Sequence, residues 1–202
     1  MYTIQFCEIK TKKMRKIILL AVILTVGTSL FAQNKWIADK AHAKIGFTGT
    51  HMTISEVDGS FKKFDASFSS SKPDFTDAVF EVTVDVNSIG TDNEMRDSYL
   101  KGDRYFDVAK YPELSFKSKS ISKVGDNIYK LTGNLTAHGV TKSVTFNMVV
   151  TGVGKDSKTQ KSIVGLKITG TINRNDFGVG HVPAAMVGED IEIRAVGEFD
   201  QQ

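Results

Sequence analysis

Histidine and serine are the side chains of this sequence best suited to acid–base or nucleophilic chemistry, and their spacing predicts neither. The four histidines, His42, His51, His138 and His181, form no His-x-His pair and no H-E-x-x-H motif. No serine lies in a G-x-S-x-G elbow, and the sequence has no phosphate loop or dinucleotide fingerprint. We therefore predict a protein that is not an enzyme, with no metal and no cofactor. Two weaker alternatives are a metal site assembled from distant strands and a hydrolase of amphiphiles with His51 as base, for which no nucleophile is apparent.

Charged residues gather between Thr91 and Leu100, where a strand is expected to end and a helix to begin. Thr91 and Glu94 have the spacing of a capping box, which predicts a short helical insert near 91–105. Carboxylates in the first turn of a helix usually offset its dipole rather than act as acid–base pairs. Arg96 and Asp97 have two interpretations: they hold the head group of a ligand, or they form a surface ion pair of little energetic value.

The first 32 residues have the order of a secretory signal peptide. A basic stretch, Lys10 to Lys16, precedes an apolar block, Ile17 to Val26, and small residues lead to Ala32. The apolar block is short for a membrane span, and its alternative interpretation is a buried core helix. We predict cleavage after Ala32, which leaves residues 33–202 as a single exported domain. That domain would be periplasmic or secreted, with no stable membrane span.

Removal of this segment would change the charge of the protein. The whole chain has a formal charge of +3, but five of its 26 basic and one of its 23 acidic residues precede position 33, which leaves −1. The basic isoelectric point is therefore an effect of the export signal, and we predict no nucleic-acid partner. The single cysteine, Cys7, lies in the same segment, so the exported part has no disulfide and no thiol nucleophile.

The rest of the chain alternates apolar and polar residues with the period of β-strands. Phe80, Val82 and Val84 alternate with Glu81 and Thr83, and several later segments follow the same pattern. About eight such strands, each with one apolar face, predict an all-β, antiparallel fold. A sandwich and a barrel both remain open, because periodicity alone does not distinguish them.

The helical insert lies between two expected strands, a position from which it would cap one mouth of a barrel. Met95, Tyr99 and Leu100 recur at helical spacing and share one face of this helix. That face either lies against a ligand inside the barrel or simply plugs its end.

Short segments along nearly all of residues 33–202 match one family in the same order. The strongest is Asn87 to Leu100, and the others are Trp36 to His42, Tyr111 to Phe116, Gly133 to Thr141 and Ile172 to Gly178. On these segments the chain resembles the YceI-like family, lipocalin-like β-barrels associated with polyisoprenoid binding. The resemblance implies an antiparallel lipocalin-like β-barrel of about eight strands, with a long apolar tunnel for a prenyl or acyl chain. It also implies export to the bacterial periplasm.

Two positions depart from the family pattern. Tyr99 stands where the family often has histidine, and Ala43 stands where it often has serine. If either side chain touches the head group of a ligand, the head-group preference of this chain would differ.

The resemblance implies an exported, soluble lipid-binding protein. It would hold a polyisoprenoid or related long-chain amphiphile, of quinone, prenyl or fatty-acyl type, for transport, storage or sequestration. A structural or stress-protective barrel with a filled core is the alternative. The family analogy also suggests a homodimer, for which an exposed apolar edge strand would provide a means. We expect residues near the ligand head to be His51, Asn93, Arg96 and Tyr99. We expect residues lining the tunnel to include Phe47, Phe80, Val82, Val84, Phe116, Phe146, Met148, Leu166 and Ile168.

Overall fold

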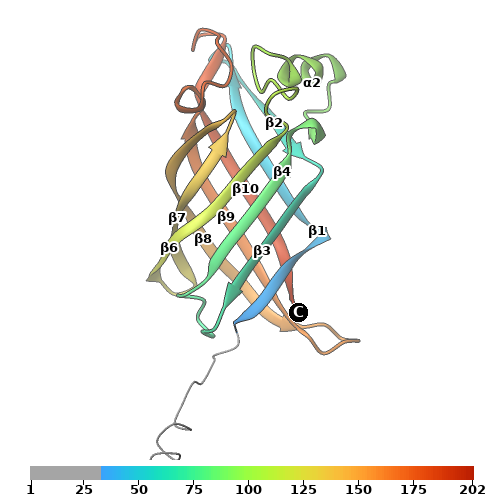
Figure 1. Ribbon diagram of the computed structural model, residues 1–202, viewed down its shortest axis with the longest axis vertical. Helices are drawn as coiled ribbons and strands as arrows, with labels where there is room; N and C mark the ends of the chain where they lie inside the picture. The colour runs from blue at the N-terminus through green and yellow to red at the C-terminus, as the bar shows by residue number, and fades with distance from the viewer. Residues whose placement is uncertain (1–32) are drawn as a thin grey trace, which may run out of the picture. The chain divides into compact units, whose positions relative to one another are not determined.

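The computed structural model describes residues 33–202, which form one antiparallel sheet closed into a barrel with an α-helix at one end (Figure 1). The expected signal peptide, residues 1–32, lies outside the described residues. Within residues 33–202, no helix is long and apolar enough to cross a membrane.

Ten strands make up the sheet, in the order β10-β9-β8-β7-β6-β4-β3-β1-β2-β5. The ring closes because β10 also pairs with β1, from Trp36 opposite Gln201 to His51 opposite Val187. The strands are β1 (Asn34–His51), β2 (Ser55–Phe61), β3 (Phe64–Ser70), β4 (Val79–Asp85), β5 (Ile89–Gly90), β6 (Glu113–Gly125), β7 (Ile128–Ala137), β8 (Val140–Lys155), β9 (Ser162–Asn173) and β10 (Val187–Gln201).

Two of the eight positions in the ring are occupied by broken strands. Two residues, Lys62 and Lys63, separate β2 from β3, and both of these strands pair with β1. The 3₁₀ turn η1 (Val86–Ser88) separates β4 from β5, which pair with β3 and β2 respectively. The predicted antiparallel barrel of about eight strands is therefore confirmed. The sandwich is excluded because the sheet closes on itself.

The alternation of residue types sets which face of each strand is buried. In β4, Phe80 and Val84 are buried whereas Glu81 and Thr83 are exposed, as the period of two requires. Long apolar strands of this kind can satisfy their backbone groups without a free edge once the ring is closed. Edges remain where a strand extends beyond its partner, as at residues 55–59 of β2, and the expected homodimer stays a prediction.

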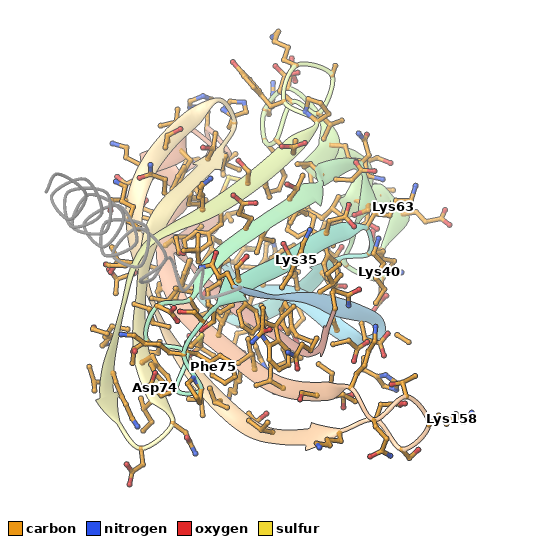
Figure 2. The ribbon with its side chains drawn as sticks, turned by 60° about the horizontal axis from the view of Figure 1, so that its bottom comes forward. Lys35, Lys40, Lys63, Asp74, Phe75 and Lys158 are labelled. Carbon is orange, nitrogen blue, oxygen red and sulfur yellow. The ribbon has the colours of Figure 1, made fainter. Side chains whose placement is uncertain are left out.

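The end of the barrel that holds the C-terminus is filled by aromatic rings. Trp36 stacks on Phe68 with ring centroids 5.6 Å apart, and Phe75 meets both rings edge-on. Figure 2 shows this end from outside, with Asp74 and Phe75 in the loop after β3 and Lys158 on the projecting β8–β9 hairpin. These rings form one large core with Tyr129, Met148 and Val164, so this end of the barrel is closed.

The opposite end carries α2 (Glu94–Lys101) and the 3₁₀ turn η2 (Arg174–Phe177). The helix is shorter than the expected 91–105, and the capping box of Thr91 and Glu94 is wrong. Asn93 is the N-cap instead, and its side chain accepts a hydrogen bond from the Arg96 amide at 3.0 Å. The Thr91 hydroxyl donates to the Asp97 carboxylate at 2.6 Å, so Thr91 does not cap the helix.

Candidate ligand-binding cavity

The inner face of the barrel encloses a cavity of about 960 Å³ that reaches the α2 end. Side chains from every full strand contribute to its wall, together with α2 and the segment after η2. Its volume lies at the upper end of the range for small-molecule sites, ~300–1,000 Å³. The barrel is therefore hollow from the α2 end down to the aromatic core, which fills the end that holds the C-terminus.

The cavity is elongated along the strands. On β10 its lining runs from Val187 to Phe199. At about 3.4 Å per residue this is ~40 Å along the strand, or ~30 Å along the barrel axis at the usual strand tilt. Such a shape suits an extended chain better than a compact ligand.

The structure brings twelve of the thirteen expected site residues to the cavity wall. Phe47, Phe80 and Phe116 lie there with Val82, Val84, Phe146, Leu166 and Ile168, and so do the four residues expected near a head group. Met148 does not line the cavity: its side chain is fully covered within the core cluster that also holds Phe80 and Leu166, both of which reach the wall. Its inward orientation follows the β8 alternation, but the side chains that cover it could not be read from the period. The part of these residues in ligand binding stays a prediction.

Three phenylalanine rings of the wall lie over glycines of a neighbouring strand. A Cβ at Gly133 would lie 2.5 Å from the Phe116 ring, and a Cβ at Gly170 would lie 2.6 Å from the Phe146 ring. Phe47 covers Gly59 in the same way. Glycine in a strand often marks such close approach by an aromatic ring. Gly133 and Gly170 keep the period of the inward-facing residues of β7 and β9, but sequence reasoning missed their role as space for a ring.

The expected head-group residues lie around the mouth of the cavity. Tyr99 is 67% exposed, so it stands at the rim rather than inside. Met95 is also exposed at the rim, whereas Leu100 packs on a buried cluster under the helix. The face shared by these three residues therefore partly plugs the end and partly borders the opening.

Arg96 and Asp97 do not form the ion pair considered from the sequence. Arg96 Nε donates to Thr91 Oγ1 at 2.7 Å, and its Nη2 donates to the Thr91 carbonyl at 2.5 Å. Asp97 accepts hydrogen bonds from the Thr91 amide and hydroxyl. Thr91 therefore ties both charged side chains to the start of α2, and Arg96 is held against the cavity wall.

Arg174 is a residue of the wall that sequence reasoning missed. It is 5% exposed, and its guanidinium donates to the carbonyl groups of Val182 (2.9 Å), Val187 (2.9 Å), Gly188 (3.0 Å) and Val179 (3.1 Å). These bonds fix the segment after η2 to the barrel mouth. The sequence shows Arg174 only as the first residue of a turn, and nothing in the periodicity of β9 indicates its burial.

The four histidines lie on four separate segments. His51 lines the cavity, and no hydrogen bond joins its ring to another side chain of residues 33–202. His138 packs edge-on against Tyr111, with its Nε2 buried and without a hydrogen-bond partner in the described part of the chain. The backbone amide of His181 donates to the Arg104 carbonyl at 3.2 Å.

His42 lies outside the barrel, on a bulge of β1 between Ala38 and Ala43. Its Nδ1 is 2.6 Å from Asp39 Oδ2 and 4.0 Å from Glu198 Oε2. The hydrogen bond to Asp39, followed by the charges of Asp39 and Glu198, raises the pKa of His42 above its usual value. The same hydrogen bond contributes most to lowering the pKa of Asp39. His42 and Glu198 are exposed and Asp39 is half-buried, and this pairing accounts for their closeness.

The comparisons with known proteins agree with this architecture. The model of the YceI-like domain matches residues 36–199. A UPF0312 protein of Staphylococcus aureus (strain MSSA476), SAS2572, is 33% identical over 166 residues, which are 80% of this chain and 94% of that protein.

Two solved structures share the barrel. The crystal structure of Burkholderia cenocepacia BcnA superposes with a TM-score of 0.71 at 25% identity, over 80% of this chain and 98% of that one. A polyisoprenoid binding domain from Saccharophagus degradans, implicated in plant cell wall breakdown, superposes with a TM-score of 0.62. It is 14% identical and covers 83% of this chain and 98% of its own, so the likeness shows the fold alone.

Proposed function

The chain belongs to the YceI-like domain family, and we propose that it is a lipid carrier that holds one long-chain amphiphile in its barrel. The amphiphile would be of polyisoprenoid, quinone or fatty-acyl type, held for transport, storage or sequestration. The observation that supports this proposal most is the long cavity of about 960 Å³ with a largely apolar wall. The proposal includes no catalytic step.

The energetics favour long chains. Removing a methylene from water contributes ~0.8 kcal/mol, whereas association costs roughly 4–15 kcal/mol in lost freedom. About 12 methylenes would contribute ~10 kcal/mol, which lies inside the range of association costs, so a 12-carbon chain should bind weakly but measurably. A chain of ~20 carbons would contribute ~16 kcal/mol and be held firmly. A cavity ~30 Å long can take such a chain in extended form.

The name of the Saccharophagus degradans domain, which shares the fold, supports a polyisoprenoid as one candidate. Export to the periplasm or the exterior is part of the proposal, and the basic, apolar and small-residue order of residues 1–32 supports it. A carrier outside the cytoplasm would move an insoluble chain through water, which requires the closed floor that the aromatic core provides.

Native mass spectrometry of the purified protein, followed by organic extraction, tests the proposal. We expect a stoichiometric adduct that releases one prenyl or acyl amphiphile on extraction. A protein that is empty and takes up neither added quinone nor fatty acid would contradict it. Conversion of an added ester or amide amphiphile into products over time would favour the hydrolase alternative instead.

A further inference from the structure

The lining of the cavity has an excess of positive charge that the barrel as a whole lacks. Arg96, Arg104 and Arg174 contribute to it, whereas Asp103 is the single carboxylate among the lining residues of the described chain. Residues 33–202 together carry a formal charge of −1, because one acidic and five basic residues precede them. The positive charge is therefore a local property of the cavity.

Arg174 is a buried charge without a counter-charge. Every hydrogen-bond acceptor of its guanidinium is neutral: the Asn175 side-chain oxygen at 3.0 Å and backbone carbonyl groups. No carboxylate of residues 33–202 forms an ion pair with it. Carbonyl groups solvate the ion but leave its unit charge uncompensated, and such a charge acts strongly across an apolar cavity.

The other two arginines of the mouth also have no ion-pair partner in the described residues. Of the carboxylates close in sequence, Asp97 accepts from Thr91 and Asp107 accepts from Lys110 at 2.8 Å. Asp103 directly precedes Arg104 and also lines the cavity, but the two form no ion pair within residues 33–202. The Nη1 atom of Arg96 makes no hydrogen bond within residues 33–202. It is therefore available to a ligand.

Arg104 and Arg174 both contact the turn at Gly180 and His181. The Arg104 carbonyl accepts from the His181 amide at 3.2 Å, and Arg174 Nη1 donates to the Gly180 carbonyl. A Cβ at Gly180 would lie 3.0 Å from the Tyr105 ring and 3.2 Å from Arg174 Nη1. Gly180 has a φ of +75°, so glycine fits this position on both grounds. Arg104 itself is exposed at the rim and lines the cavity. The three arginines therefore border the same opening.

We infer that the cavity prefers amphiphiles whose head group is negatively charged, a carboxylate or a phosphate, to neutral or cationic amphiphiles of the same chain length. Arg96 and Arg104 bind the head group directly, and Arg174 favours it through space. This inference rests on the proposed lipid-carrying function and adds which lipids are carried.

Displacement of the neutral fluorescent probe N-phenyl-1-naphthylamine tests the inference. The competitors are dodecanoate, dodecyl phosphate, dodecan-1-ol and dodecyltrimethylammonium, each below its micelle concentration. We expect one or both anions to displace the probe at a concentration about tenfold lower than the alcohol, and the cation to be the weakest. Comparing the displacing concentrations of dodecanoate and dodecyl phosphate shows whether the site prefers a carboxylate or a phosphate head group.

The double variant Arg96→Gln and Arg104→Gln should lose most of the preference for anions over the alcohol. The control Lys119→Gln and Lys158→Gln removes the same charge from exposed positions that do not line the cavity, and it should keep the preference. Equal displacement by alcohol and anions, or a preference for the cation, would overturn the inference alone. Failure of the probe and of all four competitors to bind would overturn the carrier function with it.

Discussion

The ring of Phe47 lies across Gly59, the residue opposite it in the β1–β2 ladder, and leaves no room there for a Cβ. Phe47 also lines the cavity, so the glycine sets how far the ring stands from the wall. We expect Gly59→Ala to push the ring into the cavity, lower ligand affinity severalfold and destabilise the fold by ~1–3 kcal/mol through overpacking.

Probe titration and urea denaturation of the purified variant would measure both effects. Gly152→Ala is the matched control, because a Cβ at Gly152 meets nothing within 4 Å. If Gly59→Ala bound the probe like the control, Phe47 would not shape the ligand site.

Arg174 should be the most sensitive residue of the mouth to a conservative change. Lysine keeps the charge but lacks the planar set of donors that reaches carbonyl groups from Val179 to Gly188. Hydrogen bonds to charged groups are worth ~1.5–3 kcal/mol each, so Arg174→Lys should lower the free energy of unfolding by at least ~3 kcal/mol. Urea denaturation would show this, and Arg194→Lys, on the exposed outer face of β10, should change it little. Equal stability of the two variants would show that the hydrogen bonds of Arg174 to the segment after η2 do not stabilise the fold.

Asp77 should make the barrel sensitive to acid. Burial opposes its ionisation, but hydrogen bonds from the Ser70 and Ser71 hydroxyls, both 2.5 Å long, and from the Ser71 and Lys72 amides hold its pKa well below the usual value. Since the folded pKa lies below the unfolded value of ~3.9, ionised Asp77 stabilises the fold above about pH 4. That contribution is lost as the pH falls through the folded pKa.

Asp77→Asn should therefore be less stable than the wild type at pH 7, and the difference should shrink below about pH 4. Thermal melts between pH 2 and pH 7 would measure it. Asp126→Asn, in an exposed turn, controls for the loss of a carboxylate. A constant difference between Asp77→Asn and the wild type over this range would contradict the assignment.

His42 should titrate above its usual range because it is bonded to Asp39. The NMR titration midpoint of the His42 ring should lie above 6.5 and fall toward 6.5 in Asp39→Asn. Glu198→Gln should lower it less, since Glu198 Oε2 is 4.0 Å away. The sign of the linkage is that protonated His42 stabilises the fold below pH 6.5, and this contribution is lost as the pH rises through the folded pKa. Identical midpoints in the wild type and Asp39→Asn would show that the pair does not form in solution.

The strand alternation predicted most of the fold and most of the cavity wall, because both follow from one physical period. Residues such as Val84 and Ile168 face inward wherever the register is kept. The period does not show which inward side chains are covered by their neighbours, which is why Met148 was expected at the cavity wall and is instead fully buried in the core. Sequence spacing also assigned the helix cap to Thr91, whereas the side chain of Asn93 makes the capping bond.

The role of Arg174 depends on contacts that no local pattern encodes. Its acceptors lie up to 14 residues away, on a segment folded back over the mouth. The glycines beneath the aromatic rings are different, since an inward-facing glycine in a strand is visible in the sequence. Gly133 and Gly170 occupy such positions. Each leaves room for an aromatic ring of the neighbouring strand, so the two glycines predict that Phe116 and Phe146 lie on the cavity wall.

The amount of bound amphiphile per chain in Ala195→Trp tests the central claim most directly. Ala195 lines the cavity from β10, so an indole there would occupy the space proposed for the chain. Thr171→Trp places the same side chain on the exposed face of neighbouring β9. By native mass spectrometry and extraction, we predict about one amphiphile per chain in the wild type and in Thr171→Trp, and nearly none in folded Ala195→Trp. An undiminished load in folded Ala195→Trp would show that the cavity is not where this protein holds its ligand.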